Sequence, residues 1–306
     1  MTTICYEHGY IFPDRDRPTD VSVSLLQLDL SWVLLKYERL YNFTTMSNFR
    51  FAKDYLRYRS KAKTRHGLHS PFVYRLVDNI IYDFYAKNVY AEVETIRREL
   101  LNDDRIITIT DMGAGSRVNN DPYKRIGDIA QNALKPPRLA QLIYRLAADL
   151  QPKNIIELGT SLGTTSIYLQ KAAPQAHVYT LEGCPETVDI AKESFAKAGV
   201  EEIELIPGNF DDTLKGLIDS LDQIDFVFVD GNHVKDATLR YFEWCLPKVH
   251  ENTLLIFDDI HWSRGMKEAW EQIKAHPQVT VTVDLFWMGL VYFRKGQVRE
   301  DFVIKI

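Results

Sequence analysis

From residue 154 onward, short apolar runs alternate with segments of helical periodicity, and this alternation constrains the fold more than any other feature. The runs are NIIELG, HVYTLEG, IELIPGN, IDFVFVDGN and NTLLIFDDI. The segments between them have the length of helices, about 10 to 15 residues. Strands that alternate with such helices form right-handed βαβ crossovers, so the sequence predicts an α/β fold with a parallel sheet and helices on both faces.

Two further runs, VTVTVDLF and GLVYF, close this region. Only Trp287 and Met288 separate them, which is too short for a crossover helix. We therefore expect an antiparallel hairpin at one edge of the sheet. The prediction is a seven-stranded sheet, parallel apart from its C-terminal hairpin.

The first 135 residues do not show this alternation of strands and helices, and we divide the chain into three parts. Residues 1–45 lack clean periodicity and are predicted to be a loosely attached, dispensable extension, with an extra element packed on the body as the alternative. Residues 46–135 are predicted to form a mainly helical cap or lid region. Residues 136–306 hold the sheet, and their first helix is expected at Pro137–Leu150, where apolar residues form a stripe along one side.

Composition excludes several classes of protein. The 306 residues are 45% hydrophobic and carry a net charge of -5, so neither nucleic acid nor membrane attracts the chain as a whole. Three distant cysteines form neither a zinc knuckle nor a disulfide framework, which favours a reducing cytoplasm. No run approaches the roughly 18 to 20 apolar residues of a membrane span. The sequence leaves the oligomeric state open, with a homodimer as one option.

Two glycine-containing loops compete for a cofactor, TITDMGAGS at 108–116 and NIIELGTSLGTTS at 154–166. A cofactor loop needs a buried strand before it, a helix directly after it, and a second strand that ends in an acid. The second loop has all three, because Glu182 ends the next strand and is placed to bind ribose hydroxyls. The first loop is most simply a strand and tight turn, with a lid over the substrate as the alternative.

The spacing in the second loop indicates the kind of cofactor. Gly159 and Gly163 are separated by three residues, so the loop is not the GxGxxG pattern that binds a pyrophosphate. This disfavours a nicotinamide-dependent dehydrogenase. S-adenosylmethionine has no phosphate, and Glu157 is placed to bind the ammonium of its methionine moiety.

At this point the chain resembles the class I S-adenosylmethionine-dependent methyltransferases, which have a Rossmann-like sheet. The segments that carry the resemblance are ELGTSLG, TLEG, GNFDDTL, FVFVDGNH and LLIFDD. Within this class the chain looks most like the metal-dependent O-methyltransferases of the catechol and caffeoyl-CoA type. The resemblance implies cofactor contacts from Glu157, Gly159, Ser161 and Gly163 at the methionine end, from Glu182 at the ribose, from Asn209 and Phe210 at the adenine, and from Asp230.

Three carboxylates follow two strands that we expect to be neighbours. Asp230 ends FVFVD, and Asp258 and Asp259 end LLIFDD. Oxygen ligands of this kind suit Mg²⁺ or another divalent cation. The related enzymes carry an Asp-Asn pair at the second position, so this chain departs from them in charge. The alternative is that Asp230 holds the cofactor and the Asp pair caps a helix that begins near Ser263.

Proton removal from the acceptor is assigned to His233. It lies three residues after Asp230, where catechol-type enzymes carry a lysine proposed as base, and an imidazole can take that part. An exposed loop histidine is the alternative. His261 and Trp262 are candidates for the wall of the same pocket.

The predicted function is therefore methyl transfer from S-adenosylmethionine to a hydroxyl of a small molecule, with divalent metal assistance. RNA is an alternative acceptor, because residues 50–65 are basic and contain aromatic side chains, although a solvated helix with one packed face explains them better. A methyltransferase-like subunit without catalysis is the third option. The acidic cluster and the intact glycines disfavour it.

Overall fold

The computed structural model describes residues 45–110 and 122–306, and of residues 45–49 only the backbone. The predicted extension at 1–45 and the glycines of the loop at 111–116 thus lie outside the described residues, except for residue 45. The chain divides into two units, Met1–Asn48 and Phe49–Ile306. The description below concerns the second unit.

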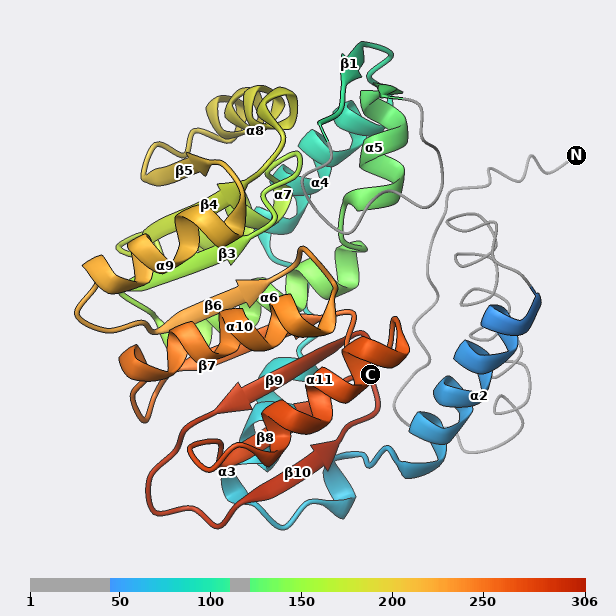
Figure 1. The fold of residues 1–306 in the computed structure, drawn as a ribbon, viewed down its shortest axis with the longest axis vertical. Helices are drawn as coiled ribbons and strands as arrows, with labels where there is room; N and C mark the ends of the chain where they lie inside the picture. Colours follow the sequence, from blue (N-terminus) through green and yellow to red (C-terminus); the bar gives the residue numbers. More distant parts are fainter. Residues whose placement is uncertain (1–44, 111–121) are drawn as a thin grey trace, which may run out of the picture. The chain divides into compact units, whose positions relative to one another are not determined.

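The centre of this unit is an eight-stranded sheet with the order β10-β8-β9-β7-β6-β3-β4-β5 (Figure 1). Its strands are β3 Asn154–Leu158, β4 His177–Glu182, β5 Ile203–Pro207, β6 Phe226–Val229, β7 Leu254–Asp258, β8 Val281–Asp284, β9 Met288–Tyr292 and β10 Glu300–Val303. Only β9 runs antiparallel to its neighbours. The predicted α/β class and the parallel sheet are confirmed.

The edge of the sheet differs from the prediction in one respect. The hairpin of β8 and β9 is present, but it is internal, because β10 pairs in parallel with β8 and adds an eighth strand. Only Phe302 of β10 is buried, while Glu300 and Asp301 are exposed. A short, charged edge strand has no apolar run from which it can be predicted.

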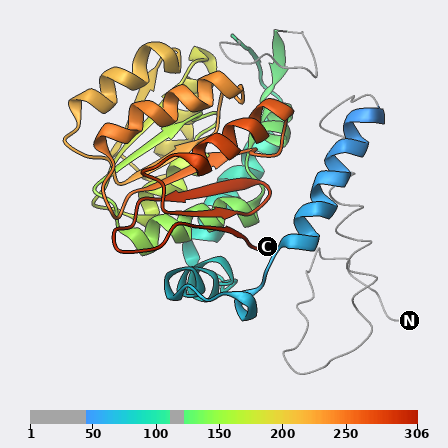
Figure 2. The same ribbon diagram turned by 60° about the horizontal axis from the view of Figure 1, so that its bottom comes forward.

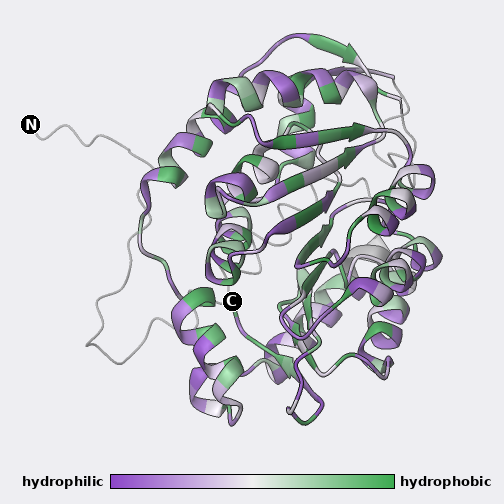
Figure 3. Ribbon diagram, turned by 90° about the vertical axis from the view of Figure 1, so that its left-hand side faces the viewer, coloured by the Kyte–Doolittle hydropathy of each residue, from purple (hydrophilic) through white to green (hydrophobic). Residues whose placement is uncertain are grey.

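Helices cover both faces of the sheet. They are α6 Pro137–Leu150, α7 Thr164–Ala172, α8 Pro185–Ala198, α9 Phe210–Ser220, α10 Lys235–Cys245, the short η3 Leu246–Lys248 and α11 Arg264–Ala275. Figure 2 shows α9, α10 and α11 on one side of the strands and α6 on the other. Each face has its own buried apolar cluster, and the strands between them contain hydrophobic segments, drawn in green in Figure 3. No helix within residues 45–110 and 122–306 has the length and apolar character to cross a membrane.

The described elements before residue 136, of α2 only the part from Phe49 onward, pack into the same body. They are α2 Thr45–Lys61, η1 Arg65–Gly67, α3 Pro71–Leu76, the π-helical turn η2 Val77–Ile81, α4 Asn88–Leu101, β1 Ile106–Thr108, β2 Tyr123–Arg125 and α5 Ile126–Ala133. Apolar residues of α4 and α5 share one buried cluster with residues of α7 and α8. The boundary predicted after residue 135 therefore does not separate two hydrophobic cores.

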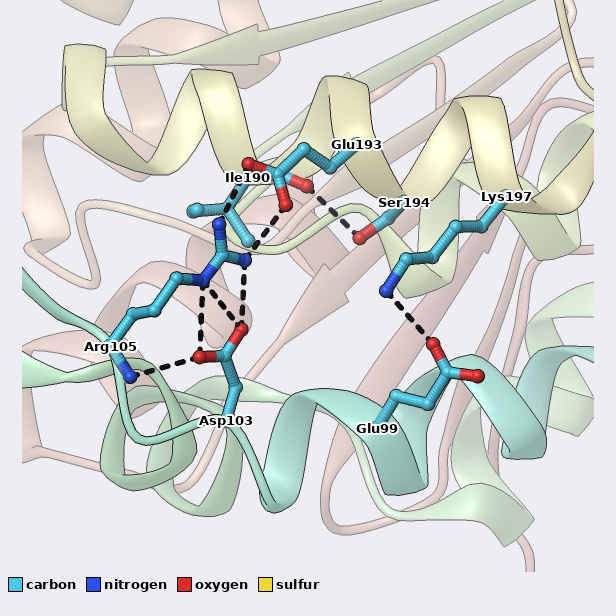
Figure 4. A network of polar contacts seen from close by, with 7 residues as sticks. All are labelled: Glu99, Asp103, Arg105, Ile190, Glu193, Ser194 and Lys197. Carbon is cyan, nitrogen blue, oxygen red and sulfur yellow. Dashed lines mark hydrogen bonds and ion pairs between the residues drawn. The ribbon is translucent and has the colours of Figure 1, made fainter.

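Ion pairs on the surface join α4 and the segment before β1 to α8 (Figure 4). Arg105 binds Glu193 at 2.7 Å and Asp103 at 2.8 Å, and Lys197 binds Glu99 at 2.8 Å. Exposed pairs of this kind contribute little free energy each. They fix the register of a contact whose stability comes from the shared apolar cluster.

The basic helix α2 has one aromatic face. Phe51, Tyr55 and Tyr58 are buried, and all three rings pack on Phe286 with centroids about 5 Å apart. The hydroxyl of Tyr58 donates to the carbonyl of Ile304. The exposed basic residues lie on the other side, so the prediction of a solvated helix with one packed face is confirmed for residues 50–61.

Close packing between β9 and α11 gives a test of the fold. A Cβ atom on Gly289 would stand 2.5 Å from the buried ring of Trp270. We expect Gly289→Ala to lower the free energy of unfolding by about 1–3 kcal/mol, because the ring has to move. The measurement is denaturant unfolding.

The matched control is Gly216→Ala in the exposed part of α9, where nothing lies within 4 Å of the added Cβ. This change should leave stability unchanged or raise it by about 0.5–1 kcal/mol, since alanine favours a helix. Equal effects of the two changes would contradict the packing described here.

Candidate cofactor and acceptor site

The loop between β3 and α7 is shaped by positive φ angles. They are +98° at Gly159, +49° at Ser161 and +85° at Gly163. A Cβ on Gly159 would stand 2.2 Å from the carbonyl oxygen of Asp230, so this glycine permits the close approach of two strand ends. A Cβ on Gly163 would stand 2.7 Å from the ring of Phe195. Both glycines are thus required by the protein's own packing.

Glu182 lies at the end of β4 and binds the same loop. Its Oε2 accepts a hydrogen bond from the backbone N–H of Ser161 at 2.7 Å, and its Oε1 accepts one from Cys184 at 2.9 Å. Each carboxylate oxygen can accept a second bond. The predicted contact with ribose hydroxyls is therefore compatible with these bonds.

Glu157 is fully buried on the face of β3 that α7 covers. Its Oε2 accepts hydrogen bonds from Ser166 and, at 2.7 Å, from Thr180. Its Oε1 is buried and has no hydrogen-bond partner among the described residues. A buried carboxylate oxygen without a donor is costly, and a donor from a bound ligand would remove this cost.

Burial also changes the protonation of this side chain. Loss of hydration raises the pKa of Glu157 to about 7, although the bonds from Ser166 and Thr180 act in the opposite direction. A cationic donor beside Oε1 would stabilise the ionised form. The ammonium of a methionine moiety is such a donor.

Asn209 and Phe210 begin α9 at the end of β5. The side chain of Asn209 caps the helix by accepting a hydrogen bond from the N–H of Asp211 at 2.9 Å. The ring of Phe210 lies against Gly231, where an added Cβ would stand 2.6 Å from it. The helix cap accounts for Asn209 by itself, and adenine contact by either residue stays a prediction.

The predicted acids meet at the carboxyl ends of β6 and β7. Val229 pairs with Phe257, so the next residues, Asp230 and Asp258, lie side by side. The Asp258 side chain is only 2% exposed. Strand register thus brings the two carboxylates together, as expected from the sequence.

A lysine that the sequence analysis did not consider lies between them. The Nζ of Lys135 is 2.9 Å from Oδ1 of Asp230 and also binds Oδ2 of Asp258. Burial lowers the pKa of Lys135, but the charges of Asp230, Asp258 and Asp259 outweigh this effect and place it above its ordinary value. The cluster therefore contains its own cation.

His233 lies at the border of this cluster. Its Nε2 is 3.8 Å from Oδ1 of Asp230 and 3.9 Å from Oδ2 of Asp259, which is too long for a hydrogen bond. One ligand atom each from Asp230, His233 and Asp258 lie within 4.8 Å of one another. The three side chains close enough to share one ion are thus Asp230, Asp258 and His233, whereas the sequence predicted Asp259 as the third ligand.

The proposed alternative role of the Asp pair, as a helix cap, is wrong. Ser263 caps α11, because its hydroxyl accepts a hydrogen bond from the N–H of Met266 at 3.0 Å. Asp259 has a φ of +53° and donates its N–H to the carbonyl of Trp287. The Asp pair belongs to the strand end and not to the helix.

His261 has partners of its own. Its Nε2 is 2.9 Å from Oδ2 of Asp284, and its ring stacks on Phe286 at 4.9 Å. The backbone N–H of Trp262 donates a hydrogen bond to the carbonyl of Asp259 at 2.9 Å. The stacking places His261 beside the aromatic face of α2, so its role as a wall of the acceptor pocket stays a prediction.

Comparison with known proteins agrees with this geometry. A family model described as a methyltransferase domain matches residues 156–260. These residues are thus similar to a methyltransferase domain, and they make up about a third of the chain. They contain the loop with Gly159, the acid Glu182 and both acidic strand ends, whereas Lys135 and α2 lie outside the match.

The curated relatives are O-methyltransferases. The chain is 28% identical over 151 residues to a catechol O-methyltransferase of Mycobacterium tuberculosis, a match that covers 47% of this chain and 67% of the relative. It is 29% identical over 127 residues to a catechol O-methyltransferase of Niastella koreensis, covering 40% and 57%. The predicted resemblance to class I O-methyltransferases is confirmed, although the chain spans only part of these relatives' length.

A solved structure shows the same fold. An SAH-bound methyltransferase of Podospora anserina superposes with a TM-score of 0.53 at 16% identity, covering 74% of this chain and 97% of that one. The similarity therefore extends into the region before residue 136. At 16% identity, this similarity supports the fold alone, and the chemistry has to be inferred from the residues of the site.

Lys135 is the residue that sequence reasoning missed. The predicted methyltransferase region begins at residue 136, one residue after Lys135, which is followed by Pro136 and Pro137 at the start of α6. Prolines fix the backbone at a helix start, which is a signal that the preceding side chain has a defined direction. The direction itself is visible only in the folded chain.

The raised pKa of Glu157 predicts a dependence of stability on pH. The folded state holds a proton that the unfolded state releases near pH 4.5, so stability falls as pH rises from there to about 7. Without cofactor, Glu157→Gln should therefore become more stable than the wild type at pH 8, by up to about 3 kcal/mol, and not at pH 4. Denaturant unfolding of both proteins at the two pH values measures this difference.

Proposed function

We propose that this protein transfers the methyl group of S-adenosylmethionine to a hydroxyl of a small molecule, with catechol-like compounds as the first candidates. The observation that carries the proposal is the buried Oε1 of Glu157, which has no hydrogen-bond partner in the described part of the chain. Glu157 lies on the strand next to the Lys135–Asp230–Asp258 cluster. A cationic cofactor beside Glu157 would have its acceptor at the adjacent strand end. The catechol O-methyltransferases among the relatives support the choice of acceptor.

The reaction assigns a role to each residue. In methyl transfer, the acceptor oxygen forms a bond to the methyl carbon while the carbon–sulfur bond breaks in line, and its electron pair goes to sulfur. The hydroxyl proton goes to the imidazole of His233. Asp230 and Asp259 lie 3.8 Å and 3.9 Å from Nε2 and stabilise the imidazolium that forms.

The resemblance also implied a divalent cation on Asp230, Asp258 and Asp259, which would bind the acceptor oxygen and favour its ionised form. The oxygen atoms suit such an ion, but the ammonium of Lys135 lies between Asp230 and Asp258. In this arrangement Asp230 and Asp258 cannot bind a divalent cation and the ammonium of Lys135 at the same time. Metal assistance therefore stays a prediction that requires Lys135 to move away.

RNA is the less favoured acceptor. Base stacking needs exposed aromatic side chains, but Phe51, Tyr55 and Tyr58 of the basic helix are buried against the body. Loss of binding with rising salt would be the mark of an RNA-binding role.

The first test is calorimetric titration of the full chain with S-adenosylmethionine, followed by incubation with catechol and detection of the methylated product. We expect His233→Ala to lower turnover by roughly 10² to 10⁴, as for removal of a general base, while cofactor affinity stays unchanged. His177→Ala is the control, because this exposed histidine begins β4 at the other end of the strand. Absence of cofactor binding, or full turnover of His233→Ala, would contradict the proposed function.

A further inference from the structure

We propose that the ammonium of Lys135, and not a divalent cation, supplies the positive charge that binds the acceptor oxygen at the ends of β6 and β7. The proposal rests on the proposed function and specifies its acceptor site. It makes Lys135 a catalytic residue contributed by the link between α5 and α6.

The first support is the surroundings of the ammonium. The Lys135 side chain is 13% exposed, and two carboxylates bind its Nζ. A lysine ammonium has three N–H donors. Asp230 and Asp258 take two of them, and the described residues show no third acceptor, so one donor is available for an oxygen of the substrate.

The second support is the way the chain fixes the lysine. Leu134 before it is buried, and Pro136 and Pro137 follow it. Arg97 of α4 donates a hydrogen bond to the carbonyl of Lys135. Lys135 is thus fixed both at its backbone and at its ammonium, which the two carboxylates bind. A hydrogen-bond donor that is fixed before the reaction stabilises developing charge best.

The third support is steric and electrostatic. An Mg²⁺ ion bridging Asp230 and Asp258 at its usual ligand distance of about 2.1 Å would occupy the place of the ammonium. Two like charges at contact distance also repel strongly in a partly buried site. Cation and ammonium therefore exclude each other.

The transfer step balances with Lys135 as the cation. The ammonium donates a hydrogen bond to the acceptor oxygen and stabilises its partial negative charge, and it keeps its own protons throughout. The sulfonium loses its positive charge as the methyl leaves, and the imidazole of His233 gains one with the hydroxyl proton. The positive charge that the sulfonium loses thus appears on the imidazole, and the ammonium remains a cation throughout the step.

Binding of Mn²⁺ alone tests this proposal without any acceptor. Calorimetric titration of the wild type should show no saturable binding, because Lys135 fills the cluster. Lys135→Met leaves Asp230, His233 and Asp258 without a cation and should bind Mn²⁺ at least about 10-fold more tightly. Lys153→Met, at an exposed position before β3, is the matched control and should behave as the wild type.

Turnover of catechol gives the second readout. We expect the wild type to keep its rate after chelation, Lys135→Met to lose about 10² to 10³ in kcat with unchanged affinity for S-adenosylmethionine, and Mn²⁺ to restore part of the loss in the variant only. If Lys135→Met does not fold, Lys135→Met with Asp258→Asn removes both charges of the buried pair and should fold, bind cofactor and stay slow.

The outcomes separate the two proposals. Saturable Mn²⁺ binding by the wild type, loss of its turnover on chelation, or full turnover of a folded Lys135→Met protein would each overturn the role of Lys135. Absence of S-adenosylmethionine binding by the wild type would instead overturn the proposed function, whatever the result with Mn²⁺.

Discussion

The parallel pairing of β3 with β4 on one side and with β6 on the other is the constraint on which the site depends. In register, these strands end at one edge of the sheet, and the chain turns there into the loops that carry Gly159, Glu182 and Asp230. The loops approach so closely that the carbonyl of Asp230 leaves no room for a Cβ on residue 159. A shift of one residue in either pairing would move Glu157 to the other face of the sheet, away from Ser166 and Thr180.

Buried charge is the second organising feature. Glu157 and Asp258 are buried at adjacent strand ends, and the side chains of Lys135 and Asp230 are only 13% and 15% exposed. The ammonium of Lys135 offsets part of the negative charge of Asp230 and Asp258, whereas Oε1 of Glu157 has no hydrogen-bond partner among the described residues. Burying ionisable groups costs stability, and a cluster of such groups at the carboxyl ends of the strands is typical of a functional site.

The described residues of 49–135 pack into the same body as the sheet. Their helices α4 and α5 share an apolar cluster with α7 and α8, and the link after α5 carries Lys135 into the acidic cluster. Arg97 of α4 binds the backbone of that lysine. This segment thus contributes the positive charge of Lys135, and its helices α4 and α5 pack on α7 and α8.

The sequence by itself determined the class of the fold, and it predicted the loop for the cofactor, because both patterns are local. The alternation of apolar runs and helices implies a parallel sheet, and the order of strand, loop, helix, strand and acid from Asn154 to Glu182 needs no distant contact. It also placed Asp230 and Asp258 at neighbouring strand ends. Tertiary structure alone decided which charge lies between them, since Lys135 and Asp258 are 123 residues apart and no periodicity relates them. It likewise decided the edge strand β10, whose exposed charges carry no apolar signal. The burial of Oε1 of Glu157 without a hydrogen-bond partner in the described part of the chain is also a property of packing.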